Sequence, residues 1–346
     1  MPLSQIPTDP TDLSVRSADP LVSYVVTLFD KAFFLPWVVR ALAEDAARLA
    51  EGLVCEFVFV DDGSSDGSAA VLRGLAGELP GRFRLIEQQN AGASTATNVG
   101  VLAATGTWIR LVDGDDLVAP GSTRALLAAA EATGCLFAYG DLADYEVERP
   151  FPLPAVETPP RERLDARQGL ARFIRNCPGN SSSMLVARAH YRQAGGCDET
   201  LVSPDQLLFL RLFCTGDGVH LPVPVALVPK AAPSRLSGQK RRSRYESLLA
   251  LKTALGEHPA LPRALAALAY RRAVSRAYTY SRHFGGGRLG NIHFWRWLMS
   301  KVWLPRDPVA AISRSLGAFT ETGSVERPDS WQTSALRRGI ARRRIA

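Results

Sequence analysis

The stretch Trp108-Ile109-Arg110-Leu111-Val112-Asp113-Gly114-Asp115-Asp116 is an apolar run that ends in an acidic turn. The same pattern occurs earlier, where Phe57-Val58-Phe59-Val60 leads into Asp61-Asp62-Gly63-Ser64-Ser65-Asp66. Because α/β sheets bind ligands just outside the carboxyl ends of their strands, two strands that end in carboxylates predict a site at one edge of such a sheet. Clustered carboxylates repel one another unless a cation or hydrogen-bond donors compensate, which favours a hard divalent metal and a phosphorylated substrate.

Strand-like and helix-like patterns alternate around these two stretches. Strands are expected over 22–29, 54–60, 83–87, 108–112, 135–139 and 184–186, and helices over 34–49, 69–79, 93–104, 122–133 and 205–214. Continuous apolar runs separated by helices are typical of a mainly parallel sheet that is covered by helices on both faces. The segment 219–228 contains Pro222 and Pro224 and is therefore expected to form an edge strand at most.

Composition argues against several classes of protein. The 346 residues are 46% hydrophobic and 22% charged, an ordinary globular balance. The five cysteines are widely spaced and form no CxxC pair, which argues for a reducing cytosol and against a disulfide framework or a zinc–thiolate site. The sequence has no apolar run of about 18 residues and no basic-then-apolar leader, so neither a membrane span nor a classical secretion signal is expected.

The net charge of +7 is unevenly distributed. From Lys230 to the end the chain has 23 Lys and Arg against 6 Asp and Glu, whereas the preceding residues have 18 against 28. An acidic part joined to a basic part predicts a metal site in the first and an anionic partner for the second. We therefore expect a loose leader over 1–19, an α/β domain over 20–237 and a basic α-helical region over 238–346.

Five motifs resemble those of glycosyltransferase family 2, in order and in spacing, over about residues 22–237. They are Val25-Val26-Thr27-Leu28-Phe29-Asp30-Lys31; the turn at 60–66; Asn90-Ala91-Gly92-Ala93-Ser94-Thr95-Ala96-Thr97-Asn98-Val99-Gly100; Thr105-Gly106-Thr107-Trp108-Ile109 with the DXD-type turn Asp113-Gly114-Asp115-Asp116; and Gly195-Gly196-Cys197-Asp198-Glu199 ahead of Pro204-Asp205. Family members are inverting enzymes with the GT-A fold. The resemblance therefore implies this Rossmann-like fold, with a mainly parallel mixed sheet and helices on both faces.

The resemblance also implies a role for individual residues. Asp205 would be the catalytic base, because inversion requires a base to take the proton of the acceptor hydroxyl as its oxygen attacks the anomeric carbon. Asp115 and Asp113 would hold Mn²⁺ or Mg²⁺, which neutralises charge on the leaving nucleoside diphosphate. The nucleotide-sugar would contact Thr27, Phe29, Asp62, Asn98, Asp113, Gly114 and Asp115, with the Asp62 carboxylate accepting from a ring N–H of the base, usually uracil.

Two positions depart from the family pattern, and plainer explanations of the motifs stay open. Thr97 stands where the family often has Arg, and Pro204 replaces the common Glu before the base. Ser234-Arg235-Leu236-Ser237 resembles a loop that closes over the diphosphate, with Lys230 or Arg235 as a phosphate contact. Seen alone, the acidic turns also fit solvated turns and helix caps, and Asp66 is expected to be an N-cap.

The C-terminal region lies outside the resemblance. Its residues 291–304 (NIHFWRWLMSKVWL) concentrate three of the six tryptophans among basic residues, which suits an interfacial amphipathic helix and equally a helix packed on the α/β domain. The arginines within 337–344 suit an anionic lipid surface. No zinc-finger, RRM-like or helix-turn-helix signature occurs, so nucleic acid is not expected as a partner.

The sequence thus predicts an inverting glycosyltransferase that moves a sugar from a nucleotide-sugar, expected to be a UDP-sugar, to a hydroxyl acceptor in surface polysaccharide or glycolipid synthesis. We expect it in the cytoplasm, free or peripheral on the inner face of the membrane. One alternative is a noncatalytic glycan- or membrane-binding protein on the same scaffold. Another is a metal-dependent phosphotransferase of the haloacid dehalogenase type, which expects a Thr soon after its Asp-x-Asp, whereas Leu117-Val118 follow Asp116.

Overall fold

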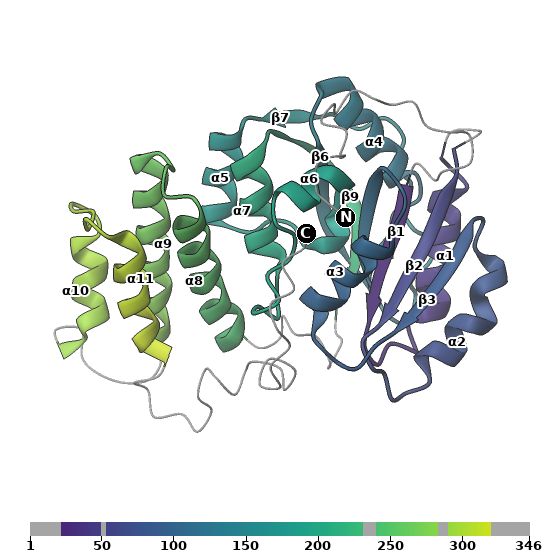
Figure 1. The fold of residues 1–346 in the computed structure, drawn as a ribbon, viewed down its shortest axis with the longest axis horizontal. Coiled ribbons are helices and arrows are strands. Elements are labelled where there is room, and N and C mark those ends of the chain that lie inside the picture. Colours follow the sequence, from purple (N-terminus) through teal and green to yellow (C-terminus); the bar gives the residue numbers. More distant parts are fainter. Residues whose placement is uncertain (1–21, 50–52, 231–239, 283–289, 320–346) are drawn as a thin grey trace, which may run out of the picture.

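A computed structural model describes residues 22–49, 53–230, 240–282 and 290–319. One mixed sheet carries helices on both faces, and a bundle of C-terminal helices lies at one end of the molecule (Figure 1). This arrangement confirms the predicted α/β class with a helical C-terminal region. The expected leader over 1–19 and the 237/238 boundary lie outside the described residues.

The sheet has nine strands in the order β3-β2-β1-β4-β8-β6-β9-β5, with β7 also paired to β9. Their bounds are β1 Val22–Leu28, β2 Cys55–Asp61, β3 Arg82–Glu87, β4 Trp108–Asp113, β5 Leu117–Val118, β6 Phe137–Tyr145, β7 Glu162–Leu164, β8 Met184–Ala187 and β9 Gly218–Pro229. Strands β3, β2, β1 and β4 are parallel, and β8 runs antiparallel to both of its neighbours. Thr27 on β1 is in register with both Val60 and Asp113, so the two acidic turns leave the sheet at the same edge.

Strand β9 differs from the prediction, because it is an interior strand and not an edge strand. It pairs with β6, β5 and β7. The register to β6 shifts between Gly140 and Asp141, where Leu221 and then Pro224 are the successive partners. Pro222 thus falls in an irregularity of the ladder, where a missing N–H is tolerated.

The helices of the α/β part alternate with its strands. They are α1 Leu35–Ala46, α2 Ser68–Leu75, α3 Ala93–Ala103, α4 Ser122–Thr133, α5 Ala166–Arg175, α6 Arg188–Gln193 and α7 Asp205–Thr215. Each sheet face has its own core, because successive side chains of a strand point to opposite faces. On β1, Tyr24 and Val26 belong to the cluster that includes α1 and α4, whereas Val25 belongs to the cluster that includes α3 and α7.

The C-terminal helices continue the second of these cores. They are α8 Lys240–Glu257, α9 Arg263–Ser281, α10 Ile292–Met299 and α11 Pro308–Leu316. Buried Leu251, Ala273 and Ile312 join the same hydrophobic cluster as Val25. Phe319, just after α11, is also fully buried and stacks on Tyr280 with 4.2 Å between the ring centroids. Burial of these side chains ties the helical region to the sheet.

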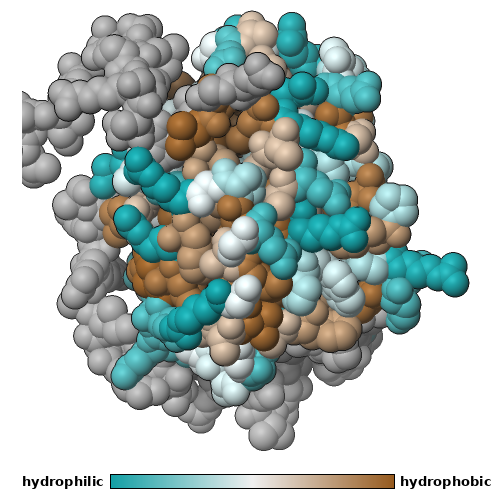
Figure 2. Space-filling view, turned by 90° about the vertical axis from the view of Figure 1, so that its right-hand side faces the viewer, coloured by the Kyte–Doolittle hydropathy of each residue, from teal (hydrophilic) through white to brown (hydrophobic). Residues whose placement is uncertain are grey.

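The end of the molecule opposite the C-terminal bundle is built from α1, α2 and β3. Its surface has both polar and apolar residues (Figure 2). None of the helices in the described part of the chain combines the length and the apolar character that a membrane crossing needs.

Candidate active site

The DXD-type turn is pressed against the end of β1. The Gly114 N–H donates to the carbonyl oxygen of Thr27 at 2.8 Å. A Cβ atom at position 114 would lie 2.8 Å from Leu28 Cβ and 2.9 Å from the Thr27 oxygen, closer than such atoms normally approach. Glycine is therefore required at position 114 for Asp113 and Asp115 to lie at the carboxyl end of β1.

Asp205 is the first residue of α7, and Ser181 fixes its carboxylate. The Ser181 N–H and hydroxyl both donate to Asp205 Oδ1, at 2.9 Å and 2.6 Å. No hydrogen bond from another described residue falls on Oδ2, which leaves this oxygen able to accept a proton. Burial raises the pKa of Asp205, the two Ser181 donors lower it in part, and the nearby Glu246 carboxylate raises it further.

The residues on either side of Ser181 hold the acidic turn. Asn180 Nδ2 donates to Asp116 Oδ2 at 2.7 Å, and the Asp113 N–H donates to Ser182 Oγ at 2.9 Å. Three consecutive residues thus join the turn after β4 to the start of α7. These contacts of the polar segment Asn180-Ser181-Ser182-Ser183 were not predicted from the sequence.

The pKa of the Asp113 carboxyl is strongly perturbed. Burial, followed by the charges of Asp116, Asp205 and Asp115, raises its pKa well above the usual value, and Lys31 opposes this shift. Like charges gathered in a poorly solvated place disfavour ionisation. The shift therefore indicates that the cluster contains more negative charge than the neighbouring Lys31 compensates. The carboxylates predicted from separate motifs therefore do come together at one site.

Lys31 supplies the cation that the cluster does contain. Its Nζ lies 2.7 Å from Asp115 Oδ2, and both side chains are largely buried. The backbone is held as well, because the Lys31 N–H donates to Ser68 Oγ and the preceding Asp30 N–H to Ser64 Oγ. This ion pair was not predicted from the sequence, in which the only signal for it was a Lys within the first motif.

The second acidic turn organises loops. Asp62 accepts from Gln88 Nε2 at 2.7 Å and from the N–H groups of Ala91 and Gly92 at 2.8 Å each. Burial raises its pKa, and these three donors partly offset that effect. The structure thus shows Asp62 tying down the 88–92 loop, and its contact with a nucleobase stays a prediction.

Asp66 is not the N-cap of α2, as the sequence suggested. Gly67 occupies the N-cap position, with a left-handed φ of 87°. Asp66 instead accepts from the Ser68 N–H at 3.0 Å and from the Ala32 N–H at 2.9 Å. It therefore links the two strand-end loops to each other.

The side chain of Asn98 makes its hydrogen bonds outside the carboxylate cluster. The buried amide accepts from the Tyr191 hydroxyl and the Cys197 N–H, and it donates to the Cys197 oxygen and to Glu199. These four bonds anchor the 195–199 motif against α3. Thr97, at the position that departs from the family pattern, donates its hydroxyl to the Ala93 oxygen within the same helix.

The remaining predicted nucleotide contacts lie at the end of β1. Thr27 is the second-to-last residue of this strand. Phe29 comes directly after the strand and has 46% of its surface exposed. An exposed aromatic ring beside a ligand edge offers a face on which a planar base can stack. Lys230 pairs with Glu146 at 2.6 Å, and the Ser234–Ser237 loop lies outside the described residues.

The oxygen ligands fit a metal that is completed by its substrate. Among the described residues, no group of three or more His, Cys, Asp or Glu side chains is placed to enclose a metal ion. Mg²⁺ and similar ions at nucleotide sites commonly use one or two carboxylates together with substrate phosphates. Asp113 and Asp115, crowded by further carboxylates, match that donor set.

A hollow of about 610 Å³ is lined by residues of α5 and of the neighbouring strands. Its lining includes Asp141, Glu162, Arg172 and His220, and also Asn176 and Pro178, which precede Asn180 in the chain. Arg172 donates to both Glu162 oxygens, at 2.9 Å and 3.1 Å. The hollow thus presents paired polar groups, and two of its lining residues belong to the segment that leads to Asn180 and Ser181.

The chain is similar to known glycosyltransferases. Residues 23–189 match the family model described as Glycosyl transferase family 2. The chain is 36% identical over 124 residues to the succinoglycan biosynthesis protein ExoO of Rhizobium meliloti (strain 1021), a match covering 36% of this chain and 33% of that protein. It is 35% identical over 112 residues to the uncharacterized glycosyltransferase EpsJ of Bacillus subtilis (strain 168), covering 32% and 31%. The chain therefore spans about a third of the length of these curated relatives.

Solved structures share the fold. TarS 1–349 of S. aureus in complex with UDP-GlcNAc matches with a TM-score of 0.58 and 16% identity, over 93% of both chains. The mannosyltransferase PcManGT from Pyrobaculum calidifontis, in complex with GDP-Man and Mn²⁺, matches with a TM-score of 0.50 and 15% identity, over 91% of this chain and 89% of that one. At such identities the likeness concerns the fold alone.

Proposed function

We propose that this chain transfers a sugar from a nucleotide-sugar to a hydroxyl acceptor with inversion, since residues 23–189 match the model of glycosyl transferase family 2 and the fold is that of GT-A glycosyltransferases. The observation that carries the proposal is the Asp205 carboxylate, held through one oxygen by Ser181 beside the DXD-type turn. A phosphotransferase is set aside, because both the family model and the fold are those of glycosyltransferases.

The chemistry follows from where the free carboxylate oxygen stands. The acceptor oxygen attacks the anomeric carbon while Asp205 Oδ2 takes the hydroxyl proton, and the bond from that carbon to the donor phosphate oxygen breaks. The nucleoside diphosphate leaves with the electron pair. A raised pKa makes Asp205 a stronger base once it is ionised, which suits proton abstraction near neutral pH.

The donor side is proposed to lie at the ends of β1 and β4. Thr27, Phe29 and Asp62 would contact the nucleoside, and the absent side chain at Gly114 would let the phosphates approach the backbone. Asp113 and Asp115 would hold Mn²⁺ or Mg²⁺, which stabilises negative charge on the leaving diphosphate. Asn98 would act through the 195–199 motif that it anchors. A UDP-sugar is the proposed donor.

The acceptor is proposed to be a growing surface glycan or glycolipid, handled in the cytoplasm or at the inner face of the membrane. The hollow lined by α5 supports a polyhydroxylated ligand, because paired charged and amide groups can bond adjacent hydroxyls. The relative named for succinoglycan biosynthesis supports a polysaccharide product.

A donor screen tests the proposal. Full-length protein would be incubated with UDP- and GDP-sugars, with and without Mn²⁺, and with glycan or lipid-linked acceptors, and the anomeric configuration of the product read by NMR. Metal-stimulated transfer with an inverted anomeric centre is expected. Nucleotide-sugar binding without transfer or hydrolysis for any donor would favour the noncatalytic alternative, and a retained configuration would remove Asp205 from the role of base.

A further inference from the structure

Helix α10 has one face that packs against the protein. His293 is buried with 2% exposure, and the Trp297 ring stacks on Tyr278 of α9 with 5.3 Å between centroids. Phe294 lies 5.5 Å from the same tyrosine ring. This inner face of α10 packs on α9, another helix of the C-terminal region, and not on the α/β part as one alternative from the sequence had it.

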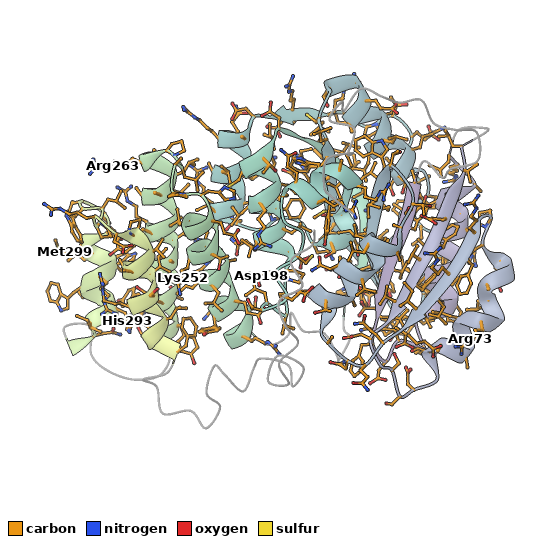
Figure 3. The ribbon with its side chains drawn as sticks, in the orientation of Figure 1. Arg73, Asp198, Lys252, Arg263, His293 and Met299 are labelled. Carbon is orange, nitrogen blue, oxygen red and sulfur yellow. The ribbon has the colours of Figure 1, made fainter. Side chains whose placement is uncertain are left out.

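The other face of α10 remains exposed, and we call it the outer apolar face. It consists of Ile292, Trp295, Leu298 and Met299 on α10 together with Val302 and Trp303 just after the helix, with exposures of 50%, 42%, 39%, 50%, 82% and 53%. Ten large hydrophobic side chains are exposed within the described ranges, and six of these ten fall within the twelve consecutive residues 292–303. Figure 3 shows Met299 at the outer edge of the molecule, at the end opposite Arg73 on α2.

Such a cluster is unusual for a surface that faces only water. Single exposed apolar residues are common, but contiguous apolar patches mark interaction sites. The contrast with the α/β part is direct, because the four other large hydrophobic side chains that are this exposed in the described ranges, Phe29, Phe33, Val54 and Leu102, are spread over more than 70 positions of the chain. The outer apolar face therefore indicates a partner surface.

The charge around this face selects the partner. From His258 to Arg306 the sequence contains nine Arg and Lys and no Asp or Glu. Lys301 and Arg306, beside the face, are exposed, and the first acidic residue that follows is Asp307, which caps α11. A negatively charged partner is attracted to this region, whereas a second copy of the chain would bring like charges together.

We propose that the outer apolar face docks the protein on the surface of an anionic lipid bilayer. Trp295 and Trp303 would lie at the headgroup level, where the amphipathic indole ring is favoured, and the aliphatic side chains would enter the acyl boundary. The surrounding Lys and Arg side chains bind lipid phosphates while their stems lie along the apolar surface. This inference goes beyond the transfer reaction, because no residue of the carboxylate cluster takes part in it.

Vesicle flotation with the full chain tests the proposal. The probes are vesicles of phosphatidylcholine alone and of phosphatidylcholine with phosphatidylglycerol. Flotation is measured at about 0.15 M salt, where charges are screened beyond about 8 Å, and at about 0.5 M salt, where the screening distance is shorter. The wild type should float with the anionic vesicles and be only partly released by the higher salt. The triple variant Trp295→Ser, Val302→Ser, Trp303→Ser should bind at least about tenfold more weakly, because it loses apolar burial.

Two further variants keep the outcome clear. Val302→Asp alters a side chain that is 82% exposed, so it should weaken binding without changing the melting temperature. The matched control Phe33→Ser and Leu102→Ser removes exposed apolar side chains of the α/β part and should leave flotation unchanged. Wild-type flotation by both α10 variants would overturn the proposal. So would concentration-dependent dimerisation that these variants abolish while vesicle binding persists.

Discussion

The carboxylate edge of the sheet and the outer apolar face of α10 show opposite departures from ordinary burial. At the sheet edge, Asp113 and its neighbours are withdrawn from water, although ionised groups are costly to bury. At α10, tryptophan and aliphatic side chains are left in water, although an interior would suit them better. Each arrangement is unfavourable for the isolated protein and becomes favourable with a partner of matching chemistry, a cation with a diphosphate in one case and a lipid surface in the other.

The two regions also differ in what holds them in place. The acidic turn and Asp205 are positioned by hydrogen bonds with a short loop segment, Asn180–Ser182, whereas α10 is positioned by aromatic packing on α9. Hydrogen bonds of this kind set proton affinity as well as position, and aromatic packing sets position alone. Substitutions should therefore affect chemistry at the first region and stability or docking at the second.

The largest effect is expected for Asp205→Asn. The amide preserves shape and the Ser181 bonds to an oxygen, but it cannot take the acceptor proton, so transfer should fall by roughly 10²–10⁴-fold while donor binding persists. Steady-state transfer and calorimetric nucleotide titration measure the two quantities. Asp198→Asn is the control, because Asp198 pairs with Arg211 at 3.6 Å outside the cluster. An inactive Asp198→Asn beside an active Asp205→Asn would show that the base was assigned to the wrong carboxylate.

Within the C-terminal helices, Phe319→Ala and Trp303→Ala should differ sharply in stability. Phe319 is fully buried against Tyr280, and removing such a ring costs about 3–5 kcal/mol of unfolding free energy. Trp303 is 53% exposed, and its removal should cost within about 0.5 kcal/mol. Urea denaturation of the two variants measures both. Equal losses would mean that the inner and outer sides of this bundle do not differ as described.

Asp115→Ala should remove the metal-dependent part of nucleotide binding. Losing a principal carboxylate ligand weakens the charge compensation of the diphosphate by several kcal/mol, about a hundredfold in affinity. Titration of UDP in the presence and absence of Mn²⁺ measures the effect. Lys31→Met is the matched comparison, because it removes the ion pair yet keeps both carboxylates, and it should retain metal dependence. Binding by Asp115→Ala that still depends fully on Mn²⁺ would remove this residue from the metal role.

The smallest effect is a pair of opposed shifts in pH dependence. Asp205 must be ionised to act as a base, so activity is lost as the pH falls through its raised pKa. Ser181→Ala removes a donor that lowers this pKa and should move the acidic limb to higher pH. Glu246→Gln removes a charge that raises it and should move the limb to lower pH, each shift being about one pH unit or less. Profiles of kcat/KM that move together, or not at all, would contradict the assignment of the limb to Asp205.

The sequence alone was sufficient for the elements whose causes are local. The predicted strands and helices of residues 22–133 correspond to β1–β4 and α1–α4, because the periodicity of apolar residues and the turn residues that end each element act over about ten neighbours. The acidic turns after β2 and β4, and the carboxylate that begins α7, were visible for the same reason. Their roles in catalysis and binding remain predictions.

The tertiary structure decided everything that depends on residues far apart in the chain. Lys31 meets Asp115 across 84 positions, and Asn180 meets Asp116 across 64, pairings that no local spacing encodes. The interior position of β9 follows from its partners β6, β5 and β7, because an irregular register accommodates a proline that local reasoning assigned to an edge. For α10, composition could not choose between packing and exposure, because a helix has two sides and only the placement of α9 determines which of them is covered.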